Sequence, residues 1–581
     1  MNYGQALAEL LAVQTKLPVE EILPSIETPP DPQMGHLAFP CFRIAKEQKK
    51  APPQIASELA AKIEETRPAW LGQAVANGPY VNIFFDRAVL AADVLVEVLA
   101  AGMEYGTNHQ GEGKTVLVEY SSPNIAKHFH VGHLGSTIIG KALDNVYRFL
   151  GYDVTSLNHL GDWGTQFGKL ITAYLKWGSR DEIETTEIEG LMQLYIKFHE
   201  EAEKDESLNE EARRWVVRMQ DGDTEGLHIW RWFVELSMRE YNRLYERMGV
   251  SFDLIRGESY YSDKMDAVAK ELQRKGLLKL SEGAQIVDLE EYGMPPCLIL
   301  RSDGGTLYPT RDIAAALDRY DTFKFDKCLY VTGNEQTLHF AQWMKVVELM
   351  GYEWAKGLVH VPYGMLLFEG GKLSTRKGDV IKMEDLFDEA EAKTLAIIEE
   401  KNPELFNKKV VAKQVGIGAL VFNKLYTSRM KDSMFSWERA LSFDGESGPY
   451  VQYTHARACS VLRKALSGES NRDFGEMALA MVSKPSFDGK LLAEDEAFEV
   501  LRLLKDFPRK VDECAEKYEP YIIARHLMEL AQAFNAFYHK HTILVDDNTP
   551  LRLCRLVLTA AVRQVLKTGL GLLGIAAPAV M

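Results

Sequence analysis

The 581-residue sequence lacks the features of a membrane protein, a disulfide-rich secreted protein and a thiolate metal protein. No apolar run reaches the roughly 20 residues of a membrane span, so we expect no membrane partner. The N-terminus carries acidic Glu9 and no positively charged lead, which is not the pattern of a signal peptide. The six cysteines are scattered without a Cys-x-x-Cys pair, which predicts a reducing, cytoplasmic setting and no thiolate metal site.

Positive charge is also scarce, since 67 Lys and Arg stand against 83 Asp and Glu, a net charge of −16. This balance argues against indiscriminate coating of nucleic acid. It leaves room for a specific nucleic-acid partner, because only the local basic footprint matters. The remaining composition, 46% hydrophobic and 26% charged, is ordinary for a globular protein. The length predicts several domains.

The N-terminal part is expected to be a small α+β domain over residues 1–110. Its first helix carries Leu10 and Leu11, and a second is led by Pro52 and Pro53. An alternating strand then covers Tyr80–Phe85.

The central part, residues 111–382, reads as a Rossmann-like α/β domain with a parallel sheet. A strand at Thr115–Glu119, a helix over about 133–150 and a strand at Asp153–Asn158 form a β–α–β unit. Ligands of such units bind at the carboxyl ends of the strands. A charged, helical insertion over about 179–300 splits this sheet, and most of its charges are a solvated face.

The sheet is expected to resume after the insertion, and the rest of the chain to be helical. Three further strands are predicted at 327–332, 358–361 and 364–368. A helical stem over 383–445 and an all-helical domain over 446–581 follow. Gly569-Leu-Gly-Leu-Leu-Gly574 matches a dinucleotide fingerprint, but it has no room for a β–α–β unit and is interpreted as helix-end packing.

The segment that says most about chemistry joins the first central strand to its helix. It holds Lys127, His130, Gly132 and His133 at a turn where a helix N-terminus favours an anion. Such donors suit a triphosphate whose charge shifts as a bond breaks. A metal pair is a weak alternative, because no third ligand stands nearby. Two histidines alone would serve equally well as capping or core residues.

A second cluster is the glycine-flanked stretch 370–378, which follows an apolar strand. Lys372, Arg376 and Lys377 give it three positive charges. A mobile basic loop can close over a polyphosphate and stabilise the leaving pyrophosphate. By itself, a solvated basic turn would be the commoner explanation.

Together the two clusters resemble the signatures of class I aminoacyl-tRNA synthetases. His130-Val-Gly-His133 is similar to the HIGH motif, and Lys372-Leu-Ser-Thr-Arg376 to a degenerate KMSKS motif. Four further segments, at 121–127, 161–168, 307–312 and 447–457, narrow the resemblance to the arginyl-tRNA synthetases. They span the chain in the order of the family.

Several positions depart from the family's pattern. Thr375 stands where the second signature usually has lysine, and the resemblance implies that Lys127 substitutes for it. His128 replaces a common proline, and Gly135 replaces a common arginine. The loss of that arginine puts any phosphate or tRNA role of this position in doubt.

The resemblance implies a set of substrate-binding and catalytic residues. A guanidinium is held best by carboxylates in a fork, although Glu119 or Asp312 taken alone could each be an ordinary ion-pair residue. Arginine would be bound by Glu119, Ser121, Asn124, His133, Tyr308, Asp312 and Gln336, and ATP by His130, Gly132, His133, Lys372 and Ser374. The catalytic residues would be Lys127, His130, His133, Lys372, Arg376 and Lys377, with Mg²⁺ arriving on the nucleotide and no metal bound by the protein.

The implied reaction is ATP-dependent activation of L-arginine to arginyl-adenylate, followed by transfer to the 2′-hydroxyl of tRNA(Arg), with activation dependent on tRNA. Catalysis would rest on positioning and electrostatics. The resemblance assigns tRNA contacts to Asn82 and Phe85, as an exposed aromatic beside an amide, and to Tyr453 and Arg457. Buried roles for these aromatic residues remain open. We expect a cytoplasmic monomer.

Two other function classes remain open on the sequence. A sister class I synthetase is disfavoured by the cation-binding set of Glu119, Tyr308 and Asp312. A non-catalytic tRNA-binding paralogue would be expected to lose His130, His133 or the basic loop, and this sequence keeps all three.

Overall fold

The structure is a computed structural model, and it describes residues 3–29, 31–302, 305–368, 381–465, 474–483, 487–545 and 548–581. The chain divides into two compact units. The first consists of Met1–Tyr105, Arg457–Phe507 and Glu529–Leu566, and the second of Gly106–Ala456, Pro508–Met528 and Lys567–Met581. Among the described residues, no helix has both the length and the apolar character needed to cross a bilayer.

The first unit contains the predicted N-terminal helices and strand. The two predicted helices are α1 (Tyr3–Thr15) and α4 (Pro52–Glu65). The predicted strand is β3 (Tyr80–Phe85), the middle strand of an antiparallel sheet. Its neighbours, β1 (Leu37–Pro40) and β2 (Leu71–Asn77), escaped prediction because their sequences are short or rich in Gly, Ala and Asn, which strands disfavour.

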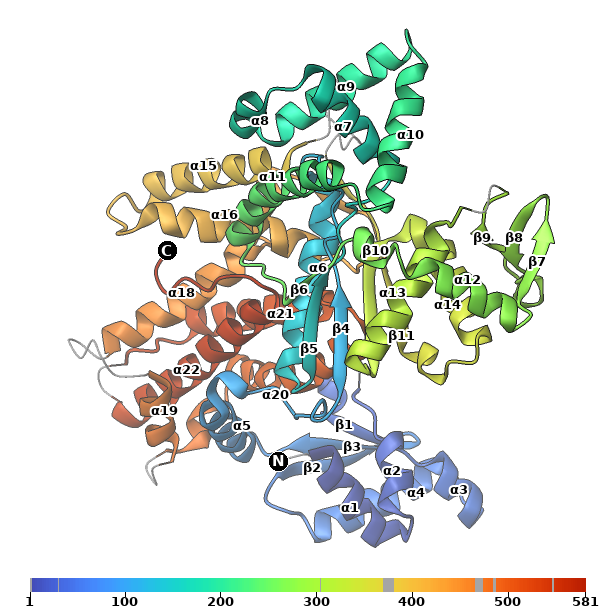
Figure 1. Cartoon of the computed structure of the whole chain (residues 1–581). Coiled ribbons are helices and arrows are strands. Elements are labelled where there is room, and N and C mark those ends of the chain that lie inside the picture. The colour runs from blue at the N-terminus through green and yellow to red at the C-terminus, as the bar shows by residue number, and fades with distance from the viewer. Residues whose placement is uncertain are drawn as a thin grey trace. The chain divides into compact units, whose positions relative to one another are not determined.

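The second unit is built on a five-stranded parallel sheet, which confirms the split α/β fold (Figure 1). Its strand order is β11-β10-β4-β5-β6. The bounds are β4 (Thr115–Glu119), β5 (Asp153–Asn158), β6 (Leu254–Ile255), β10 (Lys327–Gly333) and β11 (Leu358–Tyr363). Strands on both sides of the insertion therefore pair within one sheet.

One predicted strand belongs elsewhere. Segment 364–368 forms β12 (Leu366–Phe368), which pairs with β13 (Ser433–Phe435) in a separate two-stranded sheet. The backbone leaves the main sheet at Gly364, whose N–H donates to the carbonyl of Arg429 at 2.7 Å. This long-range partner could not be inferred from the strand's own residues.

Helix α6 (Leu134–Phe149) packs on the sheet and begins directly after the first signature, residues 130–133. Its apolar side, including Ile138, Ala142 and Val146, is buried. Gly151 follows the helix with φ of +83°, a conformation that favours glycine after a helix end.

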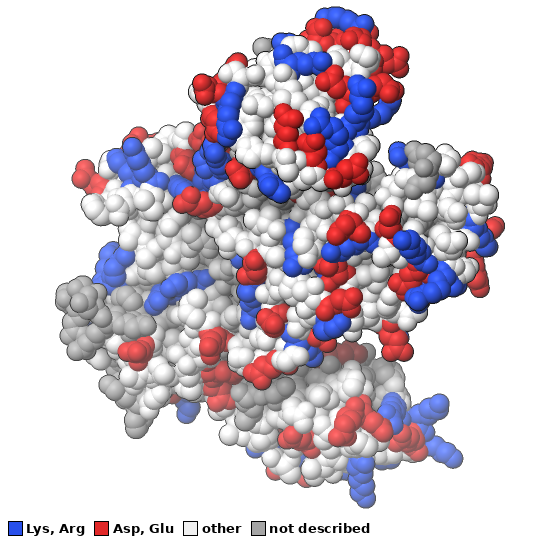
Figure 2. Space-filling view, in the orientation of Figure 1, with Lys and Arg blue, Asp and Glu red and all other residues white. Residues whose placement is uncertain are grey.

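The insertion begins as helices and ends as a small sheet. The helices are α8 (Arg180–Thr186), α9 (Ile188–Ala202), α10 (Ser207–Gln220), α11 (Thr224–Met248) and α12 (Met265–Arg274), preceded by α7 (Thr165–Trp177). Figure 2 shows Lys, Arg, Asp and Glu interspersed over the face of these helices that it displays, as a solvated surface requires. The antiparallel sheet β7 (Leu278–Ser281), β8 (Ala284–Val287) and β9 (Cys297–Leu300) was not predicted.

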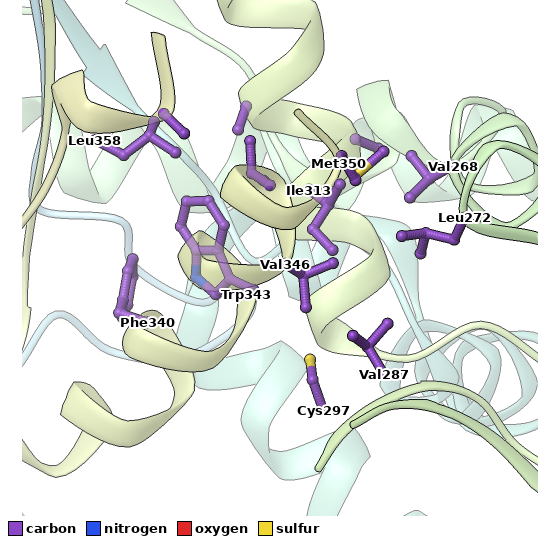
Figure 3. Packing of buried hydrophobic residues seen from close by; sticks show 14 of the residues in the cluster. Val268, Leu272, Val287, Cys297, Ile313, Phe340, Trp343, Val346, Met350 and Leu358 are labelled. Atoms are coloured by element: carbon purple, nitrogen blue, oxygen red, sulfur yellow. The ribbon is translucent and has the colours of Figure 1, made fainter. Parts of the chain in front are cut away.

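An aromatic and aliphatic core lies beside the sheet around Trp343, which is fully buried (Figure 3). It joins α13 (Tyr308–Phe323) and α14 (Thr337–Leu349) to the end of the insertion. Phe340 and Val346 come from α14, and Ile313 comes from α13. Because both helices begin at the site described below, this core holds their first turns in place.

Among the described residues after 383, the regular structure is helical, as predicted, apart from β13. Its long helices are α15 (Met383–Lys401), α16 (Lys408–Leu425), α18 (Gly448–Ala465), α20 (Asp495–Lys517), α21 (Tyr521–Lys540) and α22 (Thr549–Leu572). The glycine motif begins within α22, where a Cβ on Gly569 would lie 2.4 Å from Leu527. Its interpretation as helix-end packing is confirmed.

Candidate active site

The loop between β4 and α6 is strained and held from several sides. Ser121, Ser122 and Ala126 have φ of 71°, 49° and 61°, which non-glycine residues rarely adopt. The N–H of Ser122 donates to Asn158 at 3.1 Å, and that of Ala126 to Ser237 at 3.0 Å. Strain that is held in this way is typical of functional sites.

Backbone N–H groups hold each of the two signature histidines in one tautomer. The Gly132 N–H donates to Nδ1 of His130, and the His130 N–H donates to Nδ1 of His133, each at 3.1 Å. Each neutral ring therefore carries its proton on Nε2. A Cβ on Gly132 would lie 2.8 Å from the His130 ring, so this contact requires glycine.

Burial keeps both rings neutral. It lowers the pKa of His133 to about 3, with smaller contributions from His130 and Lys127. The pKa of His130 is lowered by burial and by Lys127. At neutral pH the pair presents N–H donors without a full charge, which suits stabilisation of developing phosphate charge.

A cavity of about 680 Å³ opens at the carboxyl ends of the parallel strands. Its wall includes the last residues of β4, β10 and β11, as expected for a ligand site of this fold. Nine predicted site residues line it, namely Glu119, Ser121, Asn124, His130, Gly132, His133, Tyr308, Asp312 and Gln336. The tertiary structure thus brings the predicted substrate-binding residues into one place.

Of the remaining predicted catalytic and ATP-binding residues, the structure describes Lys127 alone. Lys127 is exposed on the loop, and its charge acts on both signature histidines. Lys372, Ser374, Arg376 and Lys377 lie outside the residues that the structure describes.

Glu119 has a guanidinium partner within the chain. Its Oε2 lies 2.6 Å from Nη2 of Arg319, and both side chains are buried. This ion pair was not anticipated, because 200 residues separate the partners. A substrate guanidinium would have to share Glu119 with Arg319.

Two more ion pairs involve carboxylates that line the cavity. Nη1 of Arg311 lies 2.7 Å from Oε2 of Glu258. Burial raises the pKa of this glutamate to about 7. Nε2 of His339 lies 2.5 Å from Oδ2 of Asp312. Sequence reasoning missed Glu258 and His339, although His339 follows Gln336 at the three-residue spacing of one helix face.

Gly135, which departs from the family's arginine, lines the cavity against an aromatic ring. A Cβ at this position would lie 2.6 Å from Tyr363, whose side chain occupies the space. A larger residue here would require Tyr363 to move. The departure therefore has a packing reason in this chain.

The predicted tRNA contacts need one correction. Phe85 is buried, at 8% exposure, and packs on Tyr3 and Trp70, so the expectation of an exposed stacking aromatic is wrong. Asn82 is also buried. Strand alternation turns Phe85 into the core and leaves Phe84 half-buried instead.

The other two predicted tRNA residues lie on α18. Tyr453 is partly exposed, at 37%. Arg457 donates to Asn535, and its guanidinium lies 5.0 Å from the centre of the Tyr538 ring. Neither residue belongs to the cavity.

Within the described residues, no group of three His, Cys, Asp or Glu side chains is arranged to hold a metal ion. All six cysteines are buried, and none of them forms a disulfide bond.

Three family models match the chain in succession. They are the arginyl tRNA synthetase N terminal domain over residues 3–85, the catalytic domain of tRNA synthetases class I (R) over 94–437, and the DALR anticodon binding domain over 451–581.

Similar proteins cover the whole chain. It is 51% identical to an arginine–tRNA ligase of Halothermothrix orenii, covering 100% of this chain and 99% of that protein. It is 50% identical to one of Alkaliphilus metalliredigens, covering 99% of each. Among solved structures, the Thermus thermophilus arginyl-tRNA synthetase matches with a TM-score of 0.79 and 26% identity, over 99% of this chain and 100% of that one.

Proposed function

The chain belongs to the arginyl-tRNA synthetases, class I ligases that join arginine to tRNA. On this basis we propose where arginine and ATP bind in its cavity. L-arginine lies on the Glu119, Tyr308 and Asp312 side, and ATP lies over His130, Gly132 and His133. The observation that carries the proposal is the meeting of these side chains in one cavity at the strand ends. Asn124, Ser121 and Gln336 bind the amino-acid end of arginine.

In the first step, the arginine carboxylate attacks the α-phosphate of ATP, arginyl-adenylate forms and pyrophosphate leaves. The neutral His130 and His133 donate Nε2–H bonds to phosphate oxygens as their charge grows. Lys127 contributes a full positive charge from the adjoining loop, in place of the lysine that Thr375 replaces in the second signature. Lys372, Ser374, Arg376 and Lys377 act on the departing pyrophosphate.

In the second step, the 2′-hydroxyl of the terminal adenosine of tRNA(Arg) attacks the adenylate carbonyl and AMP leaves. The step needs no protein nucleophile, because the adenylate is already activated. We propose that bound tRNA is required for the first step as well. The tRNA is bound by the N-terminal domain (1–110) and by the C-terminal helical domain (446–581), which contains Tyr453 and Arg457. Between them lie the catalytic domain (111–382) and a helical stem (383–445).

The proposal has Mg²⁺ arriving on the triphosphate, because the described side chains offer it no cluster of ligands. No step above depends on a metal held by the protein. The enzyme works as a monomer in the cytoplasm, a setting supported by six cysteines that form no disulfide bond.

Arginine-dependent exchange of pyrophosphate into ATP tests the function, with and without tRNA(Arg) and with lysine and glutamate in place of arginine. We expect exchange with arginine but with neither lysine nor glutamate, and only when tRNA is present. His133→Gln should lower the exchange rate by about 100-fold, while His199→Gln on an exposed part of α9 should not change it. Exchange without tRNA would refute tRNA-dependent activation, and no exchange under any condition would refute the assigned chemistry.

A further inference from the structure

His128, just before the first signature, lies between two glutamates from different helices of the insertion. Its Nε2 is 2.9 Å from Oε2 of Glu189, at the start of α9. Its Nδ1 is 3.3 Å from Oε1 of Glu240, on α11. The side chain is only 15% exposed. A neutral imidazole has one N–H and one lone pair, so only the imidazolium can donate to both carboxylates.

The same network reaches the chain that follows the second signature loop. Glu189 also lies 3.1 Å from Nζ of Lys382, the residue before α15. The charges therefore alternate from Glu240 through His128 and Glu189 to Lys382. Alternating charges of this kind support one another more than isolated surface pairs do.

Backbone hydrogen bonds join the same two segments. The Val131 N–H donates to the Ile381 carbonyl at 3.1 Å, and the Met383 N–H donates to the Phe129 carbonyl at 2.9 Å. The Phe129 N–H also donates to Glu240, at 3.4 Å. The start of the first signature and the exit from the second signature loop are thus fastened together, and His128 links both to the insertion.

We propose that His128 is a positioning residue, which as an imidazolium between Glu189 and Glu240 holds the first signature against residues 381–383 for adenylate formation. The inference rests on the proposed function. His128 touches no predicted substrate-binding side chain in the cavity, and it acts through Phe129 and His130 on one side and through Glu189 and Lys382 on the other. It stands where the family commonly has proline, which could make neither hydrogen bond.

The charged groups that face His128 determine how pH acts on this network. The pKa of His128 is raised, first by the hydrogen bond with Glu240 and also by Glu189, against opposing effects of burial and of Lys382. The pKa of Glu189 is lowered to about 2 by His128 and Lys382. Since the pKa of His128 is raised, the network is complete below its ordinary value and is lost as pH rises through the raised value.

The test measures arginine-dependent pyrophosphate exchange with saturating tRNA(Arg) from about pH 6 to about pH 9. We expect His128→Gln to lower kcat by about ten-fold near pH 7. The KM values for arginine and ATP should stay within about two-fold, because no substrate contact is lost. The wild-type rate should fall with the deprotonation of His128, and this fall should be absent from the variant.

The chain offers a matched control in its other unit. His541 lies 3.0 Å from Glu496, which also pairs with Lys540, and 3.9 Å from Glu494. His541→Gln removes the same kind of network and should leave both kcat and the pH profile unchanged. Glu189→Gln, at a half-exposed position, is expected to match His128→Gln and decides the matter if His128→Gln does not fold.

Each result supports or overturns the inference. Wild-type kcat and an unchanged pH profile in His128→Gln, or in Glu189→Gln, would overturn it. So would a raised KM for arginine at unchanged kcat, since that pattern belongs to substrate binding. If the wild-type protein itself shows no arginine-dependent exchange, the proposed function fails, and the inference fails with it.

Discussion

At the scale of single residues, the charges that line the cavity determine which carboxylate can bind a substrate guanidinium. Four carboxylates line the cavity, namely Glu119, Glu258, Asp312 and Glu335, and the first two have arginine partners in the chain. Arginine is always charged, so these two carboxylates are already compensated. Among the described residues Asp312 pairs with His339, and no Arg or Lys compensates its charge there. We infer that Asp312 offers the negative charge that a substrate guanidinium requires.

We expect Asp312→Asn to raise the KM for arginine by about 100-fold, because a charge-assisted contact contributes up to about 3 kcal/mol. The KM for ATP should change by less than about two-fold, since phosphate contacts are untouched. Exchange kinetics over a range of arginine and ATP concentrations would measure both. Asp318→Asn is the control, since Asp318 lies on the same helix, pairs with Arg256 and does not line the cavity. An equal loss of arginine and ATP use in Asp312→Asn would contradict this assignment.

At the scale of elements, strand β3 explains why Phe85 is not a stacking platform. Its ring centroid lies 4.6 Å from that of Tyr3, and Nζ of Lys505 lies 4.4 Å from it. The half-buried Lys505 side chain packs on this ring, and burial lowers the pKa of its ammonium to about 8. Phe85 thereby joins the N-terminal sheet to α20 within the first unit.

Phe85→Ala should therefore act on stability first. We expect it to lower the free energy of unfolding by about 3–4 kcal/mol, as for other buried aromatic residues. Phe84→Ala, on the opposite and more exposed side of the strand, should cost less than about 1.5 kcal/mol. Urea unfolding measures both, and tRNA binding is then compared on folded protein. A Phe85→Ala protein of normal stability that fails to bind tRNA would contradict the packing role.

At the scale of the whole molecule, buried titratable groups set the response to acid. Burial lowers the pKa of His36 and His360 to about 4 and that of His133 to about 3. A histidine with a lowered pKa contributes stability above its unfolded value, near 6.5, and this contribution is lost as pH falls. Glu258, with a pKa raised to about 7, acts in the opposite direction over part of the same range.

The three histidines together outweigh Glu258. We therefore expect the free energy of unfolding to fall as the pH is lowered from about 6.5 to about 5, by about 1 kcal/mol per pH unit for each histidine. Urea unfolding at several pH values measures the slope. His360→Gln should make it shallower by the share of one group, while Glu258→Gln should make it steeper. Stability that increases as the pH is lowered over this range would contradict the account.

The sequence by itself determined the local elements and the class of chemistry. The strand at Thr115–Glu119, the helix after His133 and the strand at Asp153–Asn158 follow from short-range periodicity and from signals at helix ends. The signatures determined the family in the same way, because the residues proposed to bind the phosphates lie close together within each signature. Six of the nine predicted residues that line the cavity lie within residues 119–133, whereas Tyr308, Asp312 and Gln336 reach it only through the fold.

Only the tertiary structure decided which of these residues are free to act. Glu119 forms an ion pair with Arg319, and His128 pairs with Glu189 and Glu240. Each of these pairs joins segments far apart in sequence. The burial of Phe85 and the pairing of β12 with β13 likewise depend on segments that are far away in the sequence. Charge compensation and burial depend on what the fold brings near, and a local pattern carries no record of a distant partner.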